Sequence, residues 1–156
     1  SIQEMDERSL RACVLIPLFE AMGFHDVSHH HGGGLEQGKD IVMWRYGDLR
    51  ERENYAVVAK AGKIRGKVTG SGSCSEVRTQ IEQCFDTPYK DPITTAMCHV
   101  NRCWVVASGT ITKEARLSLD GILQQGHARD TRFVAGDTLW DLVQRFLLRK
   151  LVLNSR

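Results

Sequence analysis

Two charged residues lie at the ends of neighbouring apolar runs, where a buried strand would ordinarily carry no charge. Asp40 precedes the apolar run at residues 41–44, and Lys60 follows the run at residues 55–59. A carboxylate can hold Mg²⁺ through oxygen ligands, and a lysine beside the ion can orient an attacking water and stabilise charge on phosphorus. The pair therefore predicts a site for phosphate-ester hydrolysis. Taken singly, Asp40 also suits a turn and Lys60 a strand end that reaches water.

The composition is that of an ordinary globular chain. It has 156 residues, of which 42% are hydrophobic, and this length favours a single domain. Its net charge of +2 predicts little general attraction for polyanions. No apolar stretch of about 18 residues could span a membrane, and no signal-peptide pattern opens the chain. An odd number of cysteines without the paired spacing of a zinc site predicts free thiols in a reducing cytoplasm. They are Cys13, Cys74, Cys84, Cys98 and Cys103.

Helical and strand patterns alternate along the chain. A helical apolar period covers residues 4–24, with Pro17 either kinking the helix or starting its second half and Gly23 as its stop. Ser73 or Ser75, and later Thr112, are expected to cap two further helices. Strands are predicted at 40–46, 55–61, 102–108 and 131–136, with a strand or extended loop at 25–31 and helices at 73–85, 112–125 and 137–153. This order predicts an α/β fold in which helices flank a central mixed sheet.

Three further stretches could contact a ligand. Residues 45–67 are mildly basic, which suits either a solvated hairpin or contact with a polyanion. The segment "HHHGGG" (29–34) could bind a transition metal or form a polar loop beside the site. The segment "GSGS" (70–73) lacks the lysine of a nucleotide-binding loop, but its backbone N–H groups could contact a DNA phosphate.

Five motifs follow one another in an order that points to a known group. They are "FEAMGFHDV" (19–27), "LEQGKDIV" (35–42), "VVAKAG" (57–62), "WVVASGTITKEAR" (104–116) and "FVAGDTLWDLV" (133–143). Together they resemble the Mrr-like restriction endonuclease branch of the PD-(D/E)XK nuclease superfamily. The resemblance implies a restriction-endonuclease-like fold over residues 1–156, as one domain of a larger polypeptide.

The resemblance also implies the site residues. Asp40 matches the metal-binding aspartate and Lys60 the catalytic lysine, but Val58 stands where the motif has Glu, Asp or Gln. Glu36, four residues before Asp40, and Glu20, on the first helix, are the acids that could complete a site for Mg²⁺ or Mn²⁺. Contacts to nucleic acid are expected from a helical glutamine and from the basic residues after the catalytic lysine. These are Gln80, Lys63, Arg65 and Lys67, with Gln83 as a further candidate.

The expected function is metal-dependent endonucleolytic cleavage of double-stranded DNA, in restriction or anti-phage defence. Expected partners are DNA and further domains of the same polypeptide, such as an NTPase or sensor module, with homodimerisation left open. The alternative is a catalytically impaired pseudonuclease that binds DNA or another protein, because Val58 offers no metal ligand.

Overall fold

A five-stranded sheet forms the middle layer of the computed structural model, which describes residues 1–30, 38–66 and 73–155. β1 pairs with β2 and β2 with β3 in antiparallel fashion, whereas β3 pairs with β6 and β6 with β7 in parallel. The expected mixed sheet is therefore confirmed. The strands in spatial order are β1 (His25–His29), β2 (Ile41–Tyr46), β3 (Arg52–Lys60), β6 (Arg102–Ala107) and β7 (Thr131–Ala135). A separate small ladder joins β4 (Tyr89–Lys90) to β5 (Met97–Cys98).

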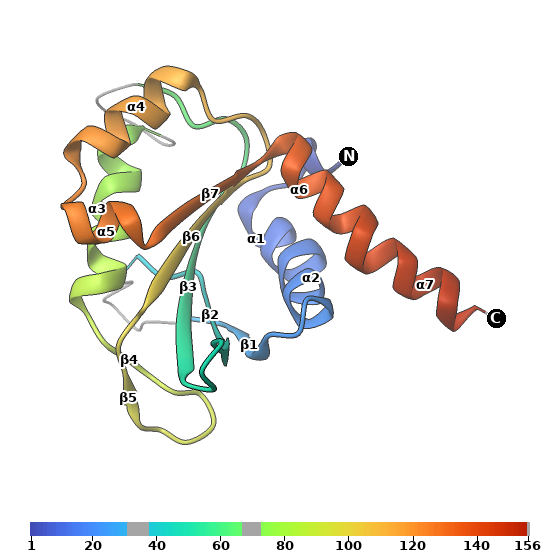
Figure 1. Ribbon diagram of the computed structural model, residues 1–156. Helices are drawn as coiled ribbons and strands as arrows, with labels where there is room; N and C mark the ends of the chain where they lie inside the picture. The colour runs from blue at the N-terminus through green and yellow to red at the C-terminus, as the bar shows by residue number, and fades with distance from the viewer. Residues whose placement is uncertain (31–37, 67–72, 156) are drawn as a thin grey trace.

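Helices cover both faces of this sheet (Figure 1). One face packs against α3 (Cys74–Asp86), α4 (Lys113–Ile122) and α5 (Gln125–Arg129). The other packs against an N-terminal helix and the start of a C-terminal helix that projects away from the sheet. The elements on this side are η1 (Ile2–Glu4), α1 (Glu7–Ser9), η2 (Leu10–Leu15), α2 (Ile16–Ala21), α6 (Gly136–Leu142), η3 (Val143–Leu148) and α7 (Arg149–Asn154). Among the described residues, no helix is both long enough and apolar enough to cross a membrane.

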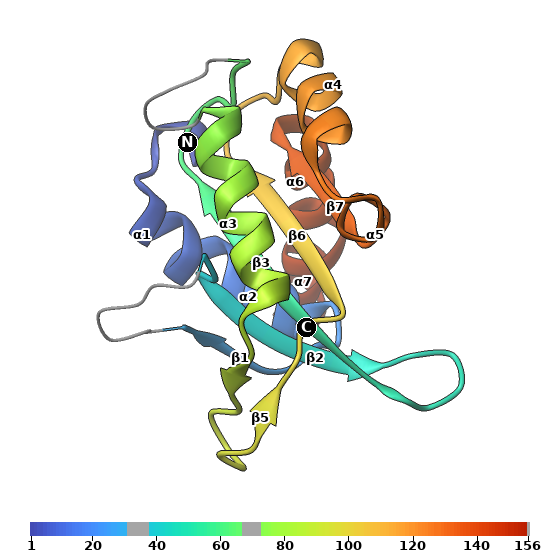
Figure 2. The same ribbon diagram turned by 90° about the vertical axis from the view of Figure 1, so that its left-hand side faces the viewer.

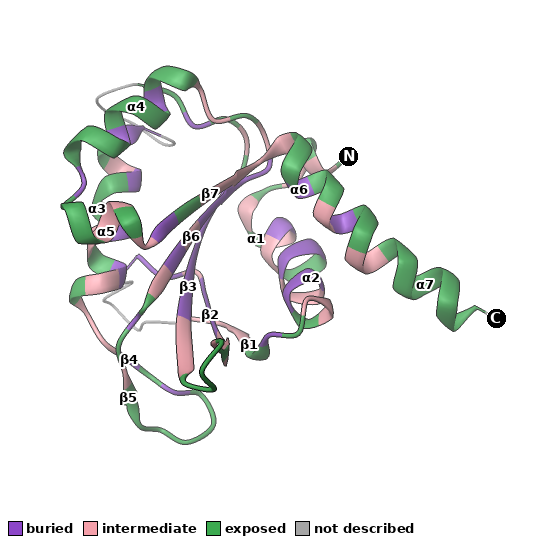
Figure 3. Cartoon of the chain, viewed as in Figure 1, coloured by how far each residue is buried: buried purple, intermediate pink, exposed green. Residues whose placement is uncertain are grey.

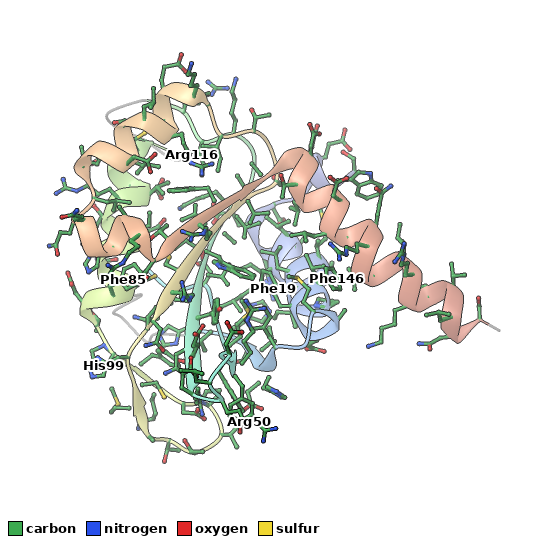
Figure 4. All side chains as sticks on the ribbon, viewed as in Figure 1. Phe19, Arg50, Phe85, His99, Arg116 and Phe146 are labelled. Atoms are coloured by element: carbon green, nitrogen blue, oxygen red, sulfur yellow. The ribbon has the colours of Figure 1, made fainter. Side chains whose placement is uncertain are left out.

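Strand alternation creates two separate cores, because successive side chains point to opposite faces. Ala56 and Val58 pack toward α3 and α4, and Val57 and Ala59 pack toward the N-terminal helix. Figure 3 shows the resulting buried layers on β3 and β6 and on the inner sides of the helices. Phe19 on α2 lies between that helix and the sheet (Figure 4), with its ring 5.7 Å from the ring of Trp104.

Several sequence-based expectations are confirmed. Pro17 lies in the first turn of α2, directly after the wider turns of η2, where its missing N–H removes a hydrogen bond from the helix. Gly23 ends the helix with a φ of +95°, a conformation that favours glycine. The hydroxyls of Ser73 and Thr112 accept the capping N–H groups of α3 and α4.

The start of β3 was predicted three residues too late. The strand begins at Arg52, and the hairpin with β2 projects from the sheet (Figure 2). Arg52, Glu53 and Asn54 are polar, but they pair in register with Tyr46, Arg45 and Trp44. A partly exposed hairpin tolerates this polarity because cross-strand contacts stabilise it. The short elements α5, β4 and β5 were not predicted from the sequence.

Candidate active site

Asp40 is fixed at the entry to β2 by four hydrogen bonds. Its N–H donates to the carbonyl of Val57 (2.9 Å), and its own carbonyl accepts the N–H of His30 (3.0 Å). One carboxylate oxygen accepts the N–H of Ala59 (2.7 Å), and the other accepts Nη1 of Arg11 (2.8 Å). The carboxylate therefore extends the pairing with β3 to the residue before β2 begins, which gives it a fixed position on the sheet.

The approach to Asp40 depends on Gly38. This residue has a φ of +76° and lies so close to α3 that an added Cβ would meet the carbonyl oxygen of Gln80 at 2.3 Å. A side chain would therefore clash with helix backbone, which cannot easily move. This close passage brings the start of β2 against α3, the helix that supplies the next acidic residue.

Lys60 ends β3 and points toward α3. Its side chain is only 5% exposed, and its Nζ lies 3.0 Å from Oε1 of Glu76, whose side chain is 36% exposed. Glu76 lies in the first turn of α3, where the Ser73 hydroxyl accepts its backbone N–H. The capped helix start thus places an acid beside Lys60. Sequence reasoning placed Glu76 in this helix but did not include it in the site.

The charged groups that act on Asp40 come from α1, η2 and β3. Burial raises the pKa of Asp40, while the N–H of Ala59 and the charges of Arg11 and Lys60 lower it; Glu7 raises it further. Glu7 and Arg11 lie on the same helix four residues apart, a spacing that places both on one face. The charge of Lys60 therefore acts on Asp40, and the N-terminal helix contributes an acid and an arginine.

The structure does not bring Glu20 to this site. Glu20 is exposed on α2, nine residues after Arg11, which corresponds to roughly 13 Å along the helix. The acid of the first helix that acts on Asp40 is Glu7. The expected position of Glu20 is corrected on this geometry, while Glu36, the other expected acid, lies outside the described residues.

Val58 belongs to the core instead of the site. Its side chain is fully buried and packs in the cluster that includes Val42 and Ile81. Because Val58 packs in the core, this position of β3 supplies no ligand for a metal ion. Glu76 supplies a carboxylate beside Lys60 from the neighbouring helix.

The described residues that are expected to contact nucleic acid lie in the segment after β3 and along α3. Lys63 and Arg65 are exposed after β3, and Arg65 forms a backbone bridge with Ser73 at the start of α3. Gln80 is partly buried, with an Oε1 that has no hydrogen-bond partner among the described residues. Gln83 is exposed. Lys67 and most of the "GSGS" segment lie outside the described residues.

The "HHHGGG" segment begins beside Asp40. His29 pairs with Ile41 at the end of β1, and the N–H of His30 donates to Asp40. The ring of His30 lies 6.2 Å from that of Tyr89. The remainder of the segment, residues 31–34, falls outside the described residues.

The acids beside Lys60 are of the ligand type that magnesium prefers. Asp40 and Glu76 supply carboxylate oxygens, and Mg²⁺ commonly binds one or two carboxylates together with water and substrate phosphate. Each of these acids is already paired with a cation of the chain, Arg11 or Lys60. Binding of a metal ion would therefore have to rearrange at least one of these two ion pairs.

Comparisons with known proteins bear on the fold. No family model and no curated protein match the sequence. The structure is similar to that of restriction endonuclease FokI bound to DNA, with a TM-score of 0.57 and 15% sequence identity over 96% of this chain. The chain spans about a quarter (26%) of the length of that protein. It therefore has the expected restriction-endonuclease-like fold, whereas membership of the Mrr-like branch stays a prediction.

Proposed function

We propose that this chain is a metal-dependent endonuclease domain of the Mrr-like type that hydrolyses phosphodiester bonds in double-stranded DNA. The observation that carries the proposal is that Lys60, at the end of β3, pairs with Glu76 at the start of α3 while its charge also lowers the pKa of Asp40 at the start of β2. A carboxylate fixed by the sheet, a buried lysine and a second carboxylate on a capped helix form a rigid set of groups. Such rigid support suits a reaction that needs fixed geometry.

Each residue has a proposed role. Asp40 and Glu76 would hold Mg²⁺ or Mn²⁺, which when bound polarises the phosphate and lowers the pKa of coordinated water. Lys60 would leave Glu76 for the scissile phosphate, where it orients the attacking water and stabilises the charge that develops on phosphorus. Arg11 would keep Asp40 ionised until the metal enters, because it opposes the effect of burial on the pKa of Asp40.

DNA is the proposed substrate because exposed basic residues flank the site. Lys63 and Arg65, together with Lys67, would contact phosphates on either side of the cleaved bond, and Gln80 would face the duplex. The similar structure is that of a DNA-bound restriction endonuclease that is almost four times longer than this chain. We accordingly propose that the domain acts with further modules of one polypeptide, in restriction or anti-phage defence.

Plasmid cleavage tests the proposal. The wild-type chain should nick or linearise plasmid DNA in Mg²⁺ or Mn²⁺ but not in EDTA. Asp40→Asn, Glu76→Gln and Lys60→Ala should each lower the rate by at least about 100-fold. Asp120→Asn on the exposed side of α4 is a matched control and should cleave normally. Cleavage that persists in Glu76→Gln would remove Glu76 from the site.

A binding-only pseudonuclease is the second candidate. Two observations favour it: Val58 is fully buried, and Asp40 already pairs with Arg11 in the manner of a permanent ion pair. This candidate predicts salt-dependent retention of duplex DNA without cleavage in any divalent metal. A protein-interaction domain with the same fold would show neither property.

A further inference from the structure

A second group of metal-ligating side chains lies at the other end of α3. Glu82 and Asp86 are four residues apart on the helix, and His127 reaches them from α5. One donor atom from each of the three lies within 4.8 Å of the other two. Within the described parts of the chain, no other three His, Cys, Asp or Glu side chains come this close. The group is about 9–15 Å along the helix from Glu76, so it is separate from the candidate active site.

The imidazole of His127 is held in one orientation. Its Nδ1 contacts Oε2 of Glu82 directly, and its ring stacks on Phe85, with centroids 4.5 Å apart and planes 12° apart. The backbone is held as well, because the hydroxyl of Thr131 donates to the carbonyl of His127 (2.6 Å). Figure 4 places Phe85 beside α5. A ligand whose ring and backbone are both fixed loses little entropy when it binds a metal.

The second ring nitrogen faces an acid across a gap. Nε2 of His127 lies 4.0 Å from Oδ1 of Asp86, which is too long for a hydrogen bond. Two ligands that each lie roughly 2.0–2.2 Å from one metal ion are separated by about 3–4 Å, so a small movement of the exposed Asp86 would accommodate an ion. The carboxylate of Glu82 contacts the opposite nitrogen, Nδ1. A carboxylate in this position commonly orients a histidine that binds a metal ion through its other nitrogen.

We propose that Asp86 and His127, with Glu82 orienting the imidazole, form a binding site for a divalent transition metal ion of the zinc class. The imidazole nitrogen makes Zn²⁺, Co²⁺ or Ni²⁺ a better match than Mg²⁺, which prefers oxygen ligands. Water completes the coordination. The ion ties α5 to α3, and α5 leads directly into β7, so metal binding stabilises this side of the sheet.

Metal titration of the chelator-treated full chain tests the site. Zn²⁺ should bind at one equivalent in calorimetry, and Co²⁺ at this site should produce visible absorption that Zn²⁺ abolishes. At a Zn²⁺ concentration about 100 times Kd, the melting temperature should rise by roughly 5 °C. His127→Gln and Asp86→Asn should weaken binding by at least about 100-fold, and Glu82→Gln by about 10–100-fold.

Three control variants separate this site from other metal-binding groups. His99→Gln alters an exposed histidine elsewhere, and Asp40→Asn alters the candidate active site. Replacement of His29, His30 and His31 by Gln removes the histidine-rich segment. All three should retain the Zn²⁺ affinity of the wild-type chain. Absence of stoichiometric Zn²⁺ binding, or wild-type affinity in His127→Gln, would overturn the proposal and leave Glu82 and His127 as an ion pair only.

Discussion

The two ends of β3 carry charge in different ways. At its start, Glu53 accepts hydrogen bonds from the Tyr55 hydroxyl (3.1 Å) and from Nε of Arg102 (3.2 Å). Arg52 donates to Asp91, and its guanidinium lies 4.6 Å from the ring of Trp44. At the other end, Lys60 pairs with Glu76, whose carboxylate is partly open to solvent.

The difference separates charge that supports the fold from charge that is available for chemistry. Groups at the start of β3 are held by several hydrogen bonds and by aromatic rings, and Arg45 nearby lies within 4.6–5.8 Å of three ring centroids. At the end of β3, Lys60 is buried, and Asp40 at the start of β2 is half-buried; each pairs with a charged group that a phosphate or metal ion could replace. Buried charge of this kind adds little stability and is typical of functional sites.

Replacing one cation at each end of β3 by methionine should have opposite effects, and this is the largest expected contrast. Lys60→Met removes the buried ammonium, so cleavage should fall about 10²–10³-fold. Stability should stay equal or rise, because the carboxylate of Glu76 that remains is partly open to solvent. Arg52→Met leaves the carboxylate of Asp91, whose side chain is 1% exposed, without its cation, so stability should fall by about 2–3 kcal/mol with cleavage retained. Urea unfolding and plasmid cleavage measure both effects. Equal stability losses in the two variants would contradict the proposed difference between the two ends of β3.

Val58→Glu tests whether the end of β3 lacks a ligand. Val58 is fully buried in the core, so a glutamate there should cost about 3 kcal/mol or more unless it reaches the metal. Because Glu76 already supplies an acid beside Lys60, we expect destabilisation and no gain in Mg²⁺ affinity or cleavage. Val58→Thr, which has nearly the same shape, is the packing control. A higher cleavage rate in Val58→Glu would show that the site was incomplete.

The sequence predicted the frame of the fold well because its signals are local. Helical periodicity, the caps at Ser73 and Thr112 and the stop at Gly23 depend on residues near in sequence, and all appear in the structure. The start of β3 was missed because Arg52 and Glu53 are polar, and their stabilising partners lie across the sheet or on β6. Local composition contains no sign of those partners.

The candidate site was predicted in part for the same reason. Asp40 and Lys60 could be found from their positions at strand ends. Glu76 could not, because an acid in the first turn of a helix has an ordinary explanation in the helix dipole. Which acid of the N-terminal helix approaches Asp40 depends on how that helix packs on the sheet. The sequence alone therefore did not separate Glu20 from Glu7.

The stability that Asp91 contributes should depend on pH. Hydrogen bonds from the backbone N–H groups of Thr94 and Ile93, together with Arg52, lower the pKa of Asp91 to about 2. A carboxyl whose pKa is lowered by folding stabilises the native state above its unfolded pKa of about 4, and this contribution is lost as pH falls toward 2. Asp91→Asn should therefore cost about 2 kcal/mol at pH 6 and progressively less below pH 4.

Urea unfolding of wild type and Asp91→Asn from pH 6 to pH 2.5 measures this difference. Comparison of the two chains cancels the titration of acids that they share. Asp120→Asn, an exposed substitution of the same type, is the control for the loss of one surface carboxylate. A difference for Asp91→Asn that stayed constant through this range would mean that its ionised form has no special support in the fold.

The smallest expected effect concerns the basic residues that follow Lys60. If Lys63, Arg65 and Lys67 contact DNA phosphates, their joint replacement by Gln should weaken binding by a similar factor on every duplex sequence. It should also flatten the dependence of log K on log salt by up to about three units, roughly 0.9 for each phosphate that the protein no longer neutralises. Lys60→Ala should retain most of the affinity, because Lys60 is buried and acts at one phosphate.

Fluorescence anisotropy with labelled duplex, in Ca²⁺ to prevent cleavage, measures the slope across a salt series. Arg149→Gln with Lys150→Gln is the charge-matched control, because both residues are exposed on α7, the projecting helix on the far side of the sheet from α3 (Figure 1). For a like-for-like comparison, this pair is set against Lys63→Gln with Arg65→Gln, which should reduce the slope by about two units. If both pairs changed the slope equally, general charge and not the end of β3 would determine DNA binding.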